Sequence, residues 1–86
     1  MPPLEREFWV RSAIFERAAT MTDPDKTELV QLLSRLALTP RARSLGVRPM
    51  IQGPPESYTA PFDKALLFYQ VLADHPVLHL LEIIDL

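Results

Sequence analysis

The sequence predicts a single α+β domain over residues 1–86, in which an N-terminal αα-hairpin packs on a three- to four-stranded antiparallel sheet. Residues 24–38 carry apolar side chains at helical spacing. The last third of the chain instead contains nearly continuous apolar runs that are rich in β-branched and aromatic residues. Helices followed by a run of strands are typical of an α+β domain.

Composition excludes several classes of protein. A hydrophobic fraction of 48% argues against disorder, and the absence of cysteine excludes disulfides and a thiolate zinc site. No apolar run reaches the roughly 18 residues of a transmembrane helix, and the N-terminal prolines and charges do not look like a secretory signal. We therefore expect a cytoplasmic protein with no membrane partner and no cofactor.

The first element has two interpretations, which the sequence leaves open. Ser12 can cap a helix over residues 13–21, and residues 5–10 either open that helix or form a short strand at 7–10. Only Thr22 and Asp23 separate this element from the next helix, which favours an antiparallel αα-hairpin.

Residues 24–38 have the clearest helix signals. Asp23 is a suitable N-cap, and Pro24 falls at the first helical position, where proline is accepted. Pro40 ends the helix, because it disfavours helical geometry in the residue before it. The stripe expected to pack on the sheet consists of Leu29, Leu32, Leu33 and Leu36.

Residues 40–57 predict an irregular connection, since they contain both glycines, Gly46 and Gly53, and several prolines. After it, three strands are expected at 57–63, 65–73 and 77–86, arranged as an antiparallel meander. Pro61 would place the first of them at an edge or a bulge. The alternative is a pair of helices, because the polar residues His79, Glu82 and Asp85 are three apart.

Charge is unevenly distributed along the chain, although its net value is only −2. Residues 29–55 contain four arginines and no acidic residue, whereas both flanking segments are acidic. Arginine suits bidentate pairing with carboxylate or phosphate. The preferred interpretation is that these arginines face acidic segments of the same protein or of a partner.

The order of elements resembles the RelE/ParE toxin superfamily of bacterial toxin–antitoxin modules. The exit of the second helix at 36–40 looks like that of these toxins, and 58–62 followed by 66–71 is similar to the strands that carry the family's arginine–x–x–tyrosine pattern. The run 77–85 resembles the last hairpin. The resemblance implies a toxin whose partner is a cognate antitoxin and whose target is gyrase or the ribosome.

The sequence departs from the ribonucleolytic branch of that family. Matching Tyr69 to the family tyrosine places Leu66 where the arginine is expected, and the last strand ends in acidic residues. Cleavage by 2′-hydroxyl attack needs a base, an acid and a group that neutralises phosphate charge. The departures favour a toxin-like component that acts by protein contacts and is not an enzyme.

Two alternatives remain, a self-associating interaction module that forms homo-oligomers and a divergent ribosome-dependent messenger RNA endonuclease. Weak catalytic candidates for the latter are His79 and Tyr69. Candidates for binding nucleic acid or an acidic partner are Arg41, Arg43 and Arg48. On a helix, His75, His79 and Glu82 would share a side, but we favour structural histidines and predict no metal site.

Overall fold

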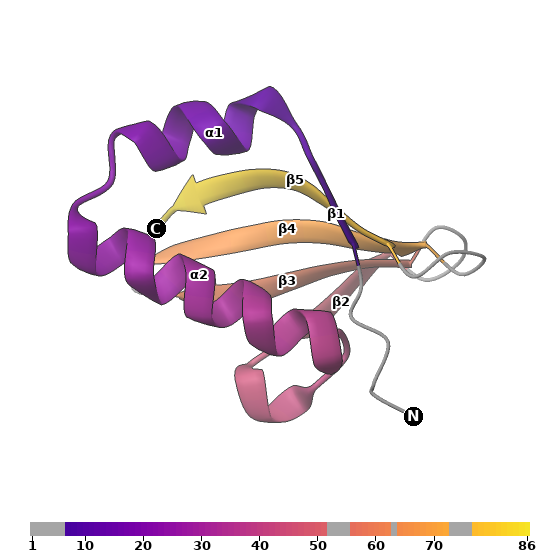
Figure 1. Ribbon diagram of the computed structural model, residues 1–86. Coiled ribbons are helices and arrows are strands. Elements are labelled where there is room, and N and C mark those ends of the chain that lie inside the picture. The colour runs from indigo at the N-terminus through magenta and orange to yellow at the C-terminus, as the bar shows by residue number, and fades with distance from the viewer. Residues whose placement is uncertain (1–6, 52–55, 63, 73–76) are drawn as a thin grey trace.

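A computed structural model describes residues 7–51, 56–62, 64–72 and 77–86 of this chain. Its elements follow the order β1 (Glu7–Val10), α1 (Ser12–Ala19), α2 (Asp23–Leu38), the 3-10 turn η1 (Arg43–Leu45), β2 (Arg48–Ile51), β3 (Glu56–Phe62), β4 (Ala65–Leu72) and β5 (Val77–Asp85). Figure 1 shows both helices packed on one sheet, which confirms the α+β prediction.

The sheet has five strands in the order β1-β5-β4-β3-β2. Strands β3, β4 and β5 form the predicted antiparallel meander, and the alternative of a helical pair is wrong. Strand β1 exists, so residues 7–10 do not open the first helix. It pairs in parallel with β5, which makes the sheet mixed instead of antiparallel throughout. The pairing continues one residue beyond β1, where Arg11 N donates to Leu80 O at 3.2 Å, and α1 then packs against β5.

The predicted irregular connection contains the additional strand β2, which the sequence did not reveal. Strand β2 pairs with β3 no further than Thr59. The β2-facing side of β3 is therefore open at Pro61, so a proline fits there although β3 lies inside the sheet. Gly46 ends η1 with φ 76°, and a Cβ at that position would lie 2.8 Å from Pro61 Cγ, so glycine is required. Gly53 lies outside the described residues.

The helix starts differ from the predictions by one residue. The N-cap of α2 is Thr22 and not Asp23, because Thr22 Oγ1 accepts from Asp25 N at 3.4 Å. The N-cap of α1 is Arg11, without a side-chain cap, and Ser12 is already helical. Helix α1 ends at Ala19, two residues before the predicted end. The αα-hairpin is confirmed, with three residues between the helices.

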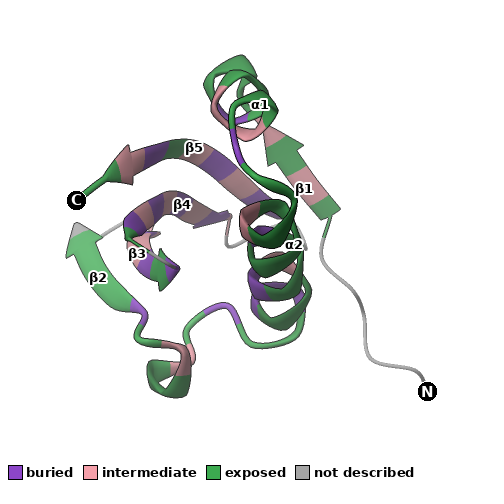
Figure 2. Cartoon of the chain, turned by 90° about the vertical axis from the view of Figure 1, so that its left-hand side faces the viewer, coloured by how far each residue is buried: buried purple, intermediate pink, exposed green. Residues whose placement is uncertain are grey.

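The core lies between the helices and one face of the sheet (Figure 2). Along β4 burial alternates strictly, so that every second side chain faces the helices. These four are Ala65, Leu67, Tyr69 and Val71. The intervening residues, Leu66, Phe68, Gln70 and Leu72, are half-buried and form the centre of the helix-free face. No helix in the described part of the chain is long and apolar enough to cross a membrane.

Candidate binding surface at the arginine-rich segment

The four arginines of the acid-free segment lie on four consecutive pieces of the chain. Arg35 is in the last turn of α2, Arg41 follows that helix, Arg43 opens η1 and Arg48 opens β2. Two hollows next to η1 are lined by three of these arginines. Arg35 lines one hollow, and Arg43 and Arg48 line the other. We call Arg35, Arg43 and Arg48, with η1 between them, the arginine surface.

Arg41 is neutralised within the chain. Its Nη2 donates to Glu56 Oε2, and Glu56 Oε1 also accepts from the Tyr58 hydroxyl at 3.1 Å. The bond from Arg41 lowers the pKa of the Glu56 carboxyl, and the same bond raises the pKa of Arg41. For Arg41, the expected acidic counterpart is therefore in the same chain, at the start of β3.

Tyr69 has a structural environment. It is fully buried, its ring stacks on Tyr58 with 5.8 Å between the centroids, and its hydroxyl donates to the carbonyl oxygen of Pro40. Burial raises the pKa of Tyr69, with the nearby Tyr58 adding to the shift. The tyrosine thus ties the exit of α2 to the middle of the sheet and stays protonated.

Of the three predicted binding candidates Arg41, Arg43 and Arg48, the structure brings Arg43 and Arg48 into one lining and pairs Arg41 with Glu56. Arg43 and Arg48 line an open hollow of about 370 Å³ with Gly46, Val47 and Pro49. Both arginines are exposed, and neither makes an ion pair with any residue in the described ranges. Their charge is available to an external anion.

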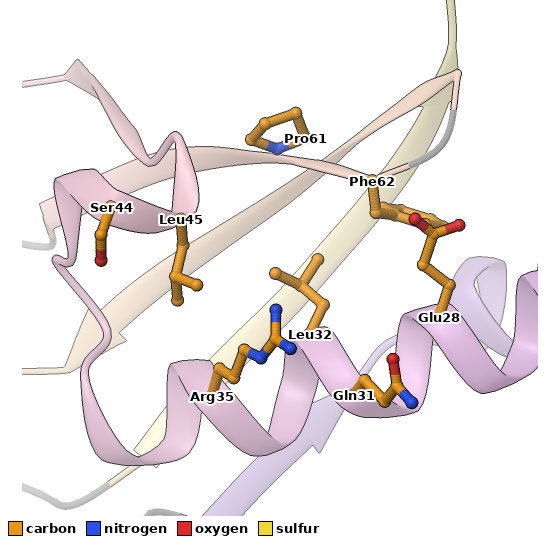
Figure 3. A pocket seen from close by; sticks show the side chains of 8 residues that line it. All are labelled: Glu28, Gln31, Leu32, Arg35, Ser44, Leu45, Pro61 and Phe62. Carbon is orange, nitrogen blue, oxygen red and sulfur yellow. The ribbon is translucent and has the colours of Figure 1, made fainter.

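A second pocket of about 210 Å³ lies between α2, η1 and β3 (Figure 3). Its lining is mixed, and the apolar residues, which we call its floor, are Leu32, Leu45, Pro61 and Phe62. Polar side chains reach it from α2 and η1, namely Glu28, Gln31, Arg35 and Ser44. Figure 3 shows the guanidinium of Arg35 directed toward the pocket and the carboxylate of Glu28 beside Phe62.

His79 is separated from these residues. It lies in β5 opposite Gln70 and is half-buried on the helix-free face, with its ring edge-on to Trp9 at 6.4 Å between centroids. Tyr69 points to the other face, so the two weak catalytic candidates do not meet. His75 lies outside the described residues, and no three potential metal ligands cluster within the described ranges.

Several residues of this surface were not found from the sequence. Glu28, Gln31 and Arg35 follow each other at intervals of three and four, which places them on one side of a helix and could have revealed them. Ser44, Leu45 and Glu56 carry no local signal. Ser44 and Leu45 reach the pocket because the fold places η1 against α2 and β3, and Glu56 reaches Arg41 from the start of β3.

This arrangement, two helices on one face of a five-stranded sheet, is the RelE-like toxin fold. A solved structure with this fold is the archaeal RelE–RelB complex from Pyrococcus horikoshii OT3. The chain matches its RelE with a TM-score of 0.87 over 95% of its own length and 96% of that chain, at 12% sequence identity. No protein-family model and no curated protein matches the sequence.

Proposed function

We propose that this chain is the toxin-like component of a type II toxin–antitoxin module and acts by protein contacts, without cleaving RNA. The observation that carries the proposal is the RelE-like fold, which extends over nearly the whole chain. The solved neighbour is a complex of RelE with RelB, and we extend that partnership to this chain by proposing an antitoxin partner.

The positions of the candidate catalytic side chains support action by contact. RNA cleavage needs an acid, a base and a phosphate clamp in one place. Here Tyr69 is buried and hydrogen-bonded to Pro40, His79 lies on the opposite face, and Arg41 is paired with Glu56. The charge that remains available, on Arg43 and Arg48, suits an acidic surface of a protein target or antitoxin.

The helix-free face offers the antitoxin an apolar surface. Leu66, Phe68 and Leu72 of β4 are half-buried there without a covering helix, and Trp9 of β1 is 51% exposed. Strands β1 and β2 are the two edges of the sheet. An antitoxin segment that folds on binding could cover the apolar face as a helix or extend either edge as a strand.

Inducible expression in bacteria tests this proposal. Growth is expected to stop after induction, and co-expression of the cognate antitoxin is expected to restore it. Tyr69→Phe and His79→Ala are expected to retain the arrest, since neither residue has a chemical role here. The buried charge of Leu36→Asp should unfold the domain and abolish the arrest, which serves as the negative control. Unimpaired growth at a high level of folded protein would contradict the proposal.

A further inference from the structure

The pocket between α2 and η1 has the character of a recognition site for one short peptide segment. Its 210 Å³ is too small for a cofactor-sized ligand but accommodates an aliphatic side chain and the polar groups next to it. Leu32, Leu45 and Phe62 supply the apolar part of the lining, on which an aliphatic group can pack.

The cation at one end of the pocket, Arg35, has no ion-pair partner among the residues that the structure describes. The guanidinium of Arg35 is directed into the pocket (Figure 3). A carboxylate is the group that a planar guanidinium binds with two parallel hydrogen bonds. Gln31 and Ser44 line the same pocket and offer both donors and acceptors, as a peptide backbone requires.

A peptide fits this pocket better than a nucleic acid. Glu28 contributes a negative charge near Phe62, which opposes a continuous run of phosphates more than a single carboxylate placed on Arg35. Phe62 is the aromatic residue of the lining and is itself buried, so no aromatic face is presented for base stacking.

The hollow of Arg43 and Arg48 extends the site across η1. Ser44 and Leu45 line the pocket of 210 Å³. Arg43 and Gly46, which flank them in the sequence, line the hollow of 370 Å³. A peptide segment that leaves the pocket of 210 Å³ over η1 therefore meets Arg43 and Arg48. This charge pattern favours additional acidic residues in the same segment.

We propose that the pocket between α2 and η1 binds an acidic–aliphatic segment of the partner protein, with an aliphatic side chain on the apolar floor and a neighbouring carboxylate on Arg35. The identity of that partner as an antitoxin rests on the proposed function. The peptide chemistry of the pocket rests on its lining residues alone. The site lies on the helix side of the sheet and is separate from the helix-free face.

Selection from a phage-displayed library of random peptides, roughly 12 residues long to span both hollows in extended form, tests the proposal on the immobilised full chain. We expect enrichment of peptides in which an aliphatic residue adjoins Asp or Glu. Arg35→Glu and Ser44→Glu, which add negative charge from two different elements, should weaken binding of a selected peptide roughly tenfold or more. Arg11→Glu is the matched control, because Arg11 is exposed and lines neither hollow, and it should bind like the unaltered chain.

Other outcomes of this selection would contradict the peptide-binding proposal. Enriched peptides without acidic residues, no enrichment, or binding that Arg35→Glu and Ser44→Glu leave unchanged would overturn the proposal, provided that both variants keep the circular dichroism of the unaltered chain. So would a short single-stranded RNA that binds here in place of peptides. Growth arrest without peptide binding would refute the pocket and leave the toxin proposal intact, whereas peptide binding without growth arrest would do the reverse.

Discussion

At the scale of single residues, Glu56 connects the segment after α2 to the sheet. Its carboxylate accepts from Arg41 on one oxygen and from Tyr58 on the other, and Tyr58 stacks in turn on Tyr69. Tyr69 closes the connection through the carbonyl oxygen of Pro40. Tyr69, one of the two catalytic candidates, is thus part of a chain of contacts that joins Pro40 and Arg41 to strands β3 and β4.

The pKa of Glu56 determines how the stability of these contacts depends on pH. Because Arg41 holds that pKa below its ordinary value of 4.5, the ion pair stabilises the fold above that pH, and the stabilisation is lost as pH falls through the lower folded value. Glu56→Gln should therefore lower the thermal unfolding midpoint at about pH 7, and this difference should shrink as the pH falls below 4.5. Thermal melts of both proteins across this range provide the measurement.

Glu16→Gln is the matched control for that experiment, because it removes the same charge from an exposed position of α1. It should leave the shape of the stability profile unchanged. An effect of Glu56→Gln that is the same at both ends of the pH range would show that the ion pair with Arg41 does not stabilise the domain.

At the scale of elements, α2 carries the pocket residues on one side and the core leucines on another. Its sequence signals were strong enough to predict its extent within one residue. Strand β2 could not be predicted in the same way. It is only four residues long, contains a proline, and pairs with β3 across a register shift, so its existence depends on a tertiary contact and not on its own propensity.

Substitutions at the start of α2 test whether Thr22 or Asp23 caps the helix. Thr22→Ala removes the side chain that accepts from Asp25 N and should lower the free energy of unfolding by about 1 kcal/mol. Asp23→Ala should cost less, because Asp23 lies in the first turn and contributes only through the helix dipole. Thr27→Ala, at an exposed position inside α2, controls for the loss of a threonine. Urea denaturation that ranks Asp23→Ala as the more damaging change would identify Asp23 as the cap.

At the scale of the whole molecule, the fold class and the order of its main elements could be predicted from the spacing of apolar residues and from the residues that start and end helices. The parallel pairing of β1 with β5 could not, because it joins residues about seventy positions apart. For the same reason, the pairing of Arg41 with Glu56 and the pocket beneath Arg35 could not be predicted, although the arginine-rich segment itself was evident. The fold shows that Arg41 forms an ion pair with Glu56, whereas Arg35, Arg43 and Arg48 form none with the residues that the structure describes.

The most direct test of the account is to map the 5′ ends of cellular messenger RNA while expression of the chain arrests bacterial growth. Action by protein contacts predicts that growth stops while the pattern of transcript ends remains that of uninduced cells. New transcript ends at regular codon positions, absent when the unfolded Leu36→Asp variant is expressed, would contradict the account and restore RNA cleavage as the function of the chain.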